Sequence, residues 1–165
     1  MPDLAWWLQN FKRSAFRLET LPQYLVPQEE EMLARFKRGE EVRMPDDHPW
    51  LVRVRQHVVS GKAMRRVRVV TYPLTDYLRF ELAMYRQTVA AGEDIRVCSS
   101  PEIAGYGDWW LFDDRVVVTM NYDEAGHFLG TEQDATDVVT YCRRRDLALE
   151  HSIPFADYAT RSARQ

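Results

Sequence analysis

The 165-residue sequence lacks several features by which protein classes are recognised. It has only two cysteines, Cys98 and Cys142, which cannot form a disulfide framework and do not have the spacing of a metal site. We therefore expect two buried thiols in a reducing compartment. No apolar run approaches the roughly 20 residues of a membrane span, and the first residues do not resemble a signal peptide. These absences predict a cytoplasmic protein with no membrane contact.

Charge and known catalytic motifs also give little indication of function. A net charge of −3 provides no general attraction to nucleic acid or membranes. The four histidines are scattered, and the nearest approach to a ligand cluster, Asp46-Asp47-His48, lacks a metal-binding spacing. No nucleophile elbow surrounds Ser99 or Ser100. We expect no metal and no cofactor, and whether the protein is an enzyme stays open.

The composition is that of a folded domain. An apolar share of 45% with five tryptophans indicates a substantial core, and the length suits one domain over residues 1–165. We expect residues 1–62 to form a mainly helical segment that packs on the rest. Residues 63–155 are expected to contain a βαβ unit, antiparallel strands and a C-terminal helix.

The clearest pattern lies between Met64 and Cys98. A β-branched strand, Met64–Tyr72, is followed by Pro73 and then by a helix that Thr75 or Asp76 can cap. Gly92 suits the end of that helix, and Ile95–Cys98 predicts a second strand, parallel to the first. This order is typical of a right-handed βαβ crossover.

The remaining patterns complete an expected architecture. Helices are predicted at residues 28–37, from Pro49 to about Gly61, and at about 136–151. Strands are predicted at 109–112 and 115–122 around an Asp113-Asp114 turn, with a short strand at 127–130. The expected fold class is α/β, or α+β with a mixed sheet, and the sheet is expected to have about five strands. A βαβ core is extended by antiparallel strands, and helices lie on the faces.

Three blocks of sequence carry a family resemblance. They are Phe-Arg-Leu-Glu at 16–19 with a glutamate-rich helix, the segment from Gly61 through Arg66-Val67-Arg68-Val69-Val70 to Ala91-Gly92-Glu93-Asp94-Ile95-Arg96, and Asp108-Trp109-Trp110-Leu111-Phe112-Asp113-Asp114. In order and spacing the chain resembles an uncharacterised family of small actinobacterial proteins, often encoded beside Xre-type helix-turn-helix regulators. The resemblance implies such a regulator as a partner and implies no activity.

A more distant resemblance concerns the crossover and the acidic strand after it. Together they are similar to degenerate phospholipase D-like sensor domains attached to transcription regulators. Active phospholipase D enzymes require His-x-Lys-x4-Asp, and none of the four histidines here is followed two residues later by lysine. The resemblance therefore implies a phospholipase D-like fold without phosphodiester chemistry.

Candidate site residues follow from the expected sheet, because ligands of α/β proteins bind beyond the carboxyl ends of parallel strands. Arginines there would pair with an anion, aromatic rings would stack on the ligand, and Asp113 would accept a hydrogen bond. The candidates are Arg68, Tyr72, Asp76, Tyr77, Arg79, Ser99, Trp110 and Asp113.

Alternation along the strands limits this interpretation. Arg66 and Arg68 share one strand face, where they either define a polar pocket or pair internally with acids such as Glu19 or Glu81. Trp109 and Trp110 must point to opposite faces.

Three functional hypotheses remain open. The first is a non-enzymatic regulatory or ligand-sensing protein that acts with a partner regulator and binds a small molecule. The second is an enzyme or accessory protein of a specialised-metabolite pathway that acts on a small molecule. The third is nucleic-acid binding through the basic stretch 43–68, which we do not favour, because its arginines can also coat a helix face or pair with acids. Whether the protein forms a homodimer is also left open.

Overall fold

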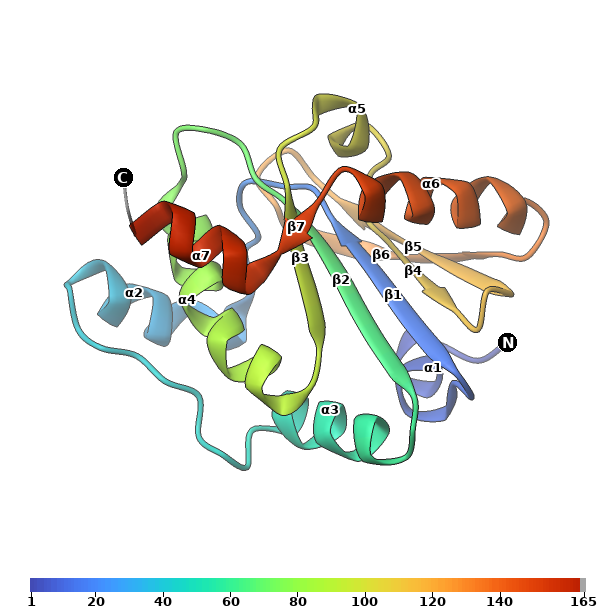
Figure 1. The fold of residues 1–165 in the computed structure, drawn as a ribbon, viewed down its shortest axis with the longest axis horizontal. Helices are drawn as coiled ribbons and strands as arrows, with labels where there is room; N and C mark the ends of the chain where they lie inside the picture. The colour runs from blue at the N-terminus through green and yellow to red at the C-terminus, as the bar shows by residue number, and fades with distance from the viewer. Residues whose placement is uncertain (164–165) are drawn as a thin grey trace.

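A seven-stranded mixed sheet forms the centre of the molecule, seen here in a computed structural model that describes residues 1–163 (Figure 1). The strand order is β6-β5-β4-β1-β2-β3-β7. The strands are β1 (Ser14–Glu19), β2 (Ala63–Val69), β3 (Asp94–Cys98), β4 (Trp109–Phe112), β5 (Val116–Tyr122), β6 (Phe128–Asp134) and β7 (Ile153–Pro154).

Helices cover both faces of this sheet. They are α1 (Leu4–Asn10), α2 (Glu30–Lys37, after the 3-10 turn Pro27–Glu29), α3 (Pro49–Val59), α4 (Asp76–Ala91), α5 (Pro101–Ala104), α6 (Val138–Glu150) and α7 (Phe155–Ala163). Helices α5 and α6 pack on one face, and α1, α3 and α4 pack on the other. The first helix, α1, and the last helix, α7, lie on opposite sides of the view in Figure 1. Among residues 1–163, no helix has the length and apolar character needed to cross a bilayer.

The predicted crossover is confirmed. Strands β2 and β3 are parallel, with Arg66 opposite Ile95 and Val69 opposite Cys98. Helix α4 connects them and begins where predicted, since the Thr75 hydroxyl accepts a hydrogen bond of 3.0 Å from the Leu78 amide. It ends at Gly92, whose φ of 116° few other residues adopt.

The N-terminal segment differs from the expectation. Residues 14–19 do not belong to a helical layer but form β1, which pairs in parallel with β2 and antiparallel with β4. The segment therefore supplies a central strand, and a second crossover through α2 and α3 joins β1 to β2. The sheet has seven strands instead of about five partly for this reason, because β1 was not predicted and β7 was not predicted either.

The second half of the chain follows the predicted order with longer elements. Asp113 and Asp114 both have positive φ, so they form the tight turn between β4 and β5 that their spacing predicts. Strand β6 runs on to Asp134, the loop after β3 contains the short helix α5, and α7 follows Pro154. Short elements of this kind carry too few periodic residues to be predicted.

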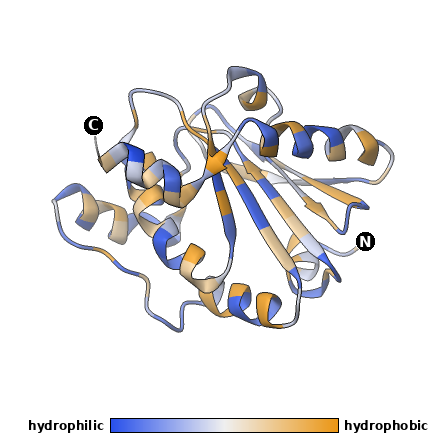
Figure 2. Cartoon of the chain, viewed as in Figure 1, coloured by the Kyte–Doolittle hydropathy of each residue, from blue (hydrophilic) through white to orange (hydrophobic). Residues whose placement is uncertain are grey.

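The two sheet faces have different chemistry. Phe16, Leu18, Val67 and Trp109 point to the α5–α6 side, where they belong to a cluster of buried hydrophobic residues. On the other side Trp110 is buried, so the adjacent tryptophans do occupy opposite faces. Figure 2 shows hydrophilic positions interrupting the hydrophobic strands in the middle of the sheet. On β2, Arg66 and Arg68 lie on the face toward α4 and form part of the site described next.

Candidate functional site

One face of the sheet changes from apolar to charged along β1 and β2. At the start of the strands, Ala15 and Met64 belong to an apolar cluster with Phe112. Because alternate residues share a face, the same side of each strand continues with ionisable side chains. These are Arg17 and Glu19 in β1 and Arg66 and Arg68 in β2. The charged half lies toward the carboxyl ends of the two parallel strands, opposite α4.

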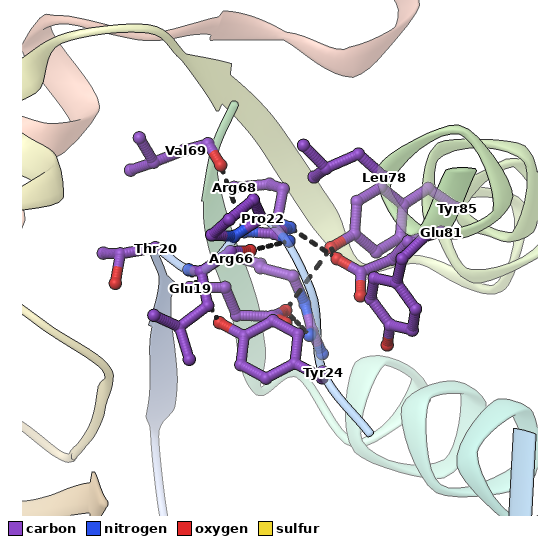
Figure 3. Close-up of polar contacts among 12 residues, drawn as sticks. Glu19, Thr20, Pro22, Tyr24, Arg66, Arg68, Val69, Leu78, Glu81 and Tyr85 are labelled. Carbon is purple, nitrogen blue, oxygen red and sulfur yellow. Dashed lines mark hydrogen bonds and ion pairs between the residues drawn. The ribbon is translucent and has the colours of Figure 1, made fainter. Parts of the chain in front are cut away.

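Arg68 forms a buried ion pair with Glu81 of α4. Its Nε lies 2.6 Å from Glu81 Oε1, and the arginine side chain is 0% exposed. Its Nη1 donates to the Val69 carbonyl at 3.0 Å, and its Nη2 donates to the Leu21 carbonyl (Figure 3). A buried charge is tolerated only with such partners. Internal pairing with Glu81, one of the two sequence-based alternatives, is therefore confirmed.

Arg66 lies between two glutamates and several aromatic rings. Its Nε donates to Glu93 Oε1 at 2.8 Å, and its Nη1 pairs with Glu19. Its guanidinium carbon lies 5.5 Å from the ring centre of Trp50 and 5.9 Å from that of Trp110. Cation–π attraction adds to the ion pairs here.

Asp108 joins the loop after β1 to the same charged layer. Its Oδ2 accepts from Arg17 at 3.1 Å and from the Tyr24 hydroxyl. Its Oδ1 accepts from the Thr20 amide at 3.0 Å and from the Thr20 hydroxyl at 2.6 Å. The carboxylate thereby holds residues 20–24 over the end of the sheet.

A cavity of about 470 Å³ lies between this charged sheet face and the helices α2 and α4. Aromatic and methionine side chains form most of its wall, which suits a ligand with a flat or apolar body. These include Tyr24, Trp50, Tyr77, Phe80, Met84 and Trp110. The carboxyl groups of Glu19, Glu29, Glu81 and Glu93 also line it. We call this cavity the α4 pocket.

Burial and ion pairing shift the ionisation of the carboxyl groups in opposite directions. Burial alone would raise the pKa of Glu19, but attraction to Arg66, Arg17 and Arg68 lowers it to about 2. For Glu81, burial outweighs the attraction to Arg68, so the pKa of this carboxyl is raised. Burial also raises the pKa of Tyr85. Tyr85 therefore keeps its proton, and its hydroxyl group donates a hydrogen bond to Glu81.

Glu29 is the most unusual acid of the α4 pocket. It is half-buried at the start of α2, and the Tyr77 hydroxyl donates to its Oε1 at 2.9 Å. Burial, with repulsion from Glu81 and Glu19, raises the pKa of Glu29 to about 7 despite that hydrogen bond and the attraction to Arg66. This carboxyl group therefore exchanges its proton near neutral pH, as binding and catalytic acids often do.

The structure brings two of the eight candidate residues into the α4 pocket, Tyr77 and Trp110. Arg68 lies beneath it with no exposed surface. Tyr72 and Ser99 line a separate cavity of about 260 Å³ beside α7, where the Tyr72 hydroxyl lies 3.0 Å from that of Tyr158. The carboxyl ends of β2 and β3 are thus divided between two cavities.

The other three candidates lie outside both cavities. Asp76 and Arg79 form an exposed ion pair of 3.5 Å on the first turn of α4. Asp113 lies at the opposite end of β1, where it accepts from the backbone amides of residues 12, 13 and 14 at 2.8, 2.6 and 3.0 Å. Partial burial would raise the pKa of Asp113, but the three backbone hydrogen bonds outweigh burial and lower this pKa. Its carboxylate is occupied by the backbone and anchors the start of the strand.

Several pocket residues were not among the sequence-based candidates, namely Glu19, Tyr24, Glu29, Trp50 and Glu93. For Glu19, alternation with Arg17 between Phe16 and Leu18 was a usable signal once 14–19 is recognised as a strand. Glu29 resembles an ordinary helix-start acid, and only the folded chain places it against Tyr77.

The basic stretch 43–68 does not form one surface. Arg66 and Arg68 point into the protein, while Arg43 forms an exposed ion pair with Asp46 at 3.2 Å. The Lys62 ammonium donates to the Phe11 carbonyl at 2.7 Å. Within residues 1–163, no cluster of three or more His, Cys, Asp or Glu side chains is placed to hold a metal ion.

These features define a mixed α/β protein whose charged sheet face and central helix enclose a ligand-sized aromatic pocket. The sequence matches the DUF6879 family, described as a domain of unknown function, over residues 2–160. The match covers nearly the whole chain, and the protein belongs to that family. No curated protein matches the sequence.

The raised pKa of Glu29 predicts a pH-dependent cost to stability. The folded state keeps the Glu29 proton up to about pH 7, whereas a glutamate in the unfolded chain loses it near its ordinary pKa of 4.5. The free energy of unfolding should therefore fall as the pH rises from 4.5 to 7. Glu29→Gln removes this effect and keeps an oxygen for the Tyr77 hydroxyl.

We expect Glu29→Gln to be more stable than the wild type by about 1 kcal/mol at pH 8, a value reduced for partial solvent screening. The difference should vanish toward pH 4.5. Urea unfolding at several pH values measures it, with Glu30→Gln on the exposed side of the same turn as the control. A constant difference at all pH values would contradict the assignment.

The buried Arg68–Glu81 pair predicts strong energetic coupling. Arg68→Met leaves Glu81 without its cation and should cost about 3–5 kcal/mol of unfolding free energy. Arg68→Met with Glu81→Gln should cost clearly less than the sum of the single changes, because no unpaired charge remains. The matched control is Arg79→Met, which breaks an exposed pair and should cost about 0.5 kcal/mol or less. Additive effects in the cycle would show that the pair is not coupled.

Proposed function

We propose that this protein is a non-enzymatic, regulatory ligand-binding protein whose small-molecule ligand occupies the α4 pocket. The observation that supports the proposal is the pocket itself. A space of about 470 Å³ with aromatic walls persists beside a sheet face whose charges are held in ion pairs. Ligand sites are typically concave, apolar and lined by a few placed polar groups.

The contacts around the pocket support binding with a rigid floor and an attached cover. Arg66 is held by Glu19 and Glu93, so it need not move when a ligand enters. The cover is the segment that contains Tyr24, whose neighbour Leu25 bonds through its amide to the Gly126 carbonyl at 3.0 Å. A ligand under this segment would alter the surface formed by it and by the β5–β6 hairpin.

Such a surface change would suit signalling to a partner. We propose a helix-turn-helix regulator as that partner and an actinobacterial source, on the basis of the resemblance described for the sequence. The crossover through α4 followed by the Asp108–Asp114 strand is also the basis for proposing a distant relation to phospholipase D-like sensor domains without catalytic residues. Nucleic-acid binding through residues 43–68 has less support, since Arg66 and Arg68 are turned inward.

A second candidate function is an enzyme that acts on a small molecule, as in a specialised-metabolite pathway. The specific observation is Glu29, whose pKa of about 7 suits a general acid or base beside the Tyr77 hydroxyl. An enzyme should convert a bound compound, with turnover lowered about 100-fold or more in Glu29→Gln. Mass spectrometry of the compound after incubation measures this. Recovery of the compound unchanged would exclude the enzyme for that compound.

Filling the pocket should abolish ligand binding without unfolding the protein. Met32 lines the pocket from α2 and is half-buried, so Met32→Trp would place an indole in the ligand space. We expect a metabolite panel to contain compounds that raise the melting temperature of the wild type and quench Trp50 and Trp110 fluorescence. Both responses should disappear in Met32→Trp.

The matched control is Glu31→Trp, which adds the same side chain at the exposed neighbouring position. It should respond like the wild type. If Met32→Trp retains the response, the ligand binds elsewhere and the proposed site is wrong.

A further inference from the structure

The carboxyl groups of the α4 pocket have hydrogen-bonding capacity that the protein does not use. For residues 1–163, every hydrogen bond and ion pair of Glu19, Glu29 and Glu81 involves Oε1. The second oxygen of each therefore accepts nothing from the described chain. A carboxylate can accept at both oxygens, and a partly satisfied buried network is energetically costly.

Donors do not match this surplus of acceptors. Arg66 is the arginine that lines the pocket, and it uses Nε and Nη1 for Glu93 and Glu19. Within residues 1–163 this leaves only its Nη2 as a free guanidinium donor in the pocket lining. The hydroxyl groups of Tyr24, Tyr77 and Tyr85 already donate to Asp108, Glu29 and Glu81. A ligand that supplies hydrogen-bond donors would complete the network.

The charges of the groups around the pocket also favour a ligand that carries hydrogen-bond donors. The layer contains three arginines, each already in an ion pair with at least one carboxylate. Arg66 alone contacts two, so its positive charge is already balanced by carboxylates although its Nη2 has no partner in residues 1–163. Glu29 has no basic partner among the ion pairs of residues 1–163, which leaves the carboxyl groups in excess of the guanidinium groups. An anionic ligand would meet repulsion, whereas a cation would be attracted.

The walls favour a cation for a second, independent reason. Ring faces of tyrosine and tryptophan attract positive charge, and aromatic cages of this composition bind ammonium groups in proteins. Tyr24 packs edge-to-face against Tyr77 and Tyr122, with ring centres 5.8 and 5.0 Å apart. Trp50 and Trp110 meet at 6.1 Å on the sheet side, where the Arg66 guanidinium carbon already lies 5.5 and 5.9 Å from their ring centres. Arg68 lies in the same way 5.3 Å from the ring centre of Tyr24, so within residues 1–163 Tyr77 and Tyr122 are the rings of this group without an arginine over them. All five rings border the same cavity.

We infer that the α4 pocket takes an organic cation, an amine or ammonium group on a flat or apolar body. The charged group would lie among the free oxygens of Glu29, Glu81 and Glu19, and the body would lie against the aromatic wall. This inference rests on the proposed function, because it names the class of ligand for that same pocket. It reverses the expectation from the sequence, in which arginines bind an anion.

Three probes that share one phenyl-ethyl or phenyl-methyl body separate charge from shape. They are phenethylamine (cation), 2-phenylethanol (neutral) and phenylacetate (anion). Calorimetric titration and protein amide chemical shifts, at about pH 8 so that the amine is charged and a carboxyl of raised pKa is ionised, would report affinity and location. We expect phenethylamine to bind about tenfold or more tightly than 2-phenylethanol, and phenylacetate to bind most weakly.

The variant Glu29→Gln removes one charge from the pocket and keeps the shape. It should lower the affinity for phenethylamine by about three- to tenfold and leave that for 2-phenylethanol within about twofold. The control Glu30→Gln makes the same change in net charge outside the pocket lining and should alter neither affinity. Melting temperatures of both variants verify that each is folded.

The outcomes separate the two proposals. If 2-phenylethanol or phenylacetate binds in the pocket as tightly as the amine, the cation inference fails while ligand binding in the pocket stands. If Glu29→Gln and Glu30→Gln weaken amine binding equally, the effect is one of net charge and the inference also fails. If none of the probes shifts amide signals of pocket residues, both the inference and the proposed function are overturned.

Discussion

Three arginines on one face of a sheet, all turned inward, impose the main constraint on this structure. A guanidinium group cannot lose its charge in a protein, so each must have an acid beside it before the sheet can close against a helix. Arg17 pairs with Asp108, Arg66 with Glu19 and Glu93, and Arg68 with Glu81. The acids come from the end of β1, the helix α4, the residue after Gly92 and the residue before β4. These four regions are therefore tied to the same small area of the sheet.

This charged layer also explains why a cavity exists. At the start of the strands, small and apolar residues let α1 and α3 pack directly on the sheet, and at β3 the residues Ile95 and Val97 do the same for α4. Between these two apolar contacts the arginine and glutamate side chains lie between the strands and the helix, as the Arg68–Glu81 pair shows. Tyr77, Phe80 and Met84 fill part of the gap from α4, and the remaining space is the pocket. Structure and proposed function thus have one physical origin.

The parts of the fold that sequence patterns predict are those governed by local chemistry. The parallel pair around α4, the Thr75 cap, the Gly92 end and the Asp113-Asp114 turn each depend on a few adjacent residues. Strand β1 does not, because Arg17 and Glu19 give its alternate positions the appearance of a solvent-exposed face. The candidate site was also predicted only in part. Tyr77 and Trp110 line the pocket, whereas the Asp113 carboxylate is engaged by the backbone at the opposite end of β1.

From the chain of amino acids alone come the mixed α/β class, the central crossover and the alternation that puts Arg66 and Arg68 on one side of a strand. Those properties depend on spacing within a few residues, and spacing is visible in a sequence. Which acids neutralise the arginines, which carboxylate oxygens stay free and which rings surround them were decided only by tertiary packing. Glu29 and Tyr77 are 48 positions apart in the chain but meet at 2.9 Å in the folded protein. A contact of that kind depends on how whole elements dock, and no local pattern encodes it.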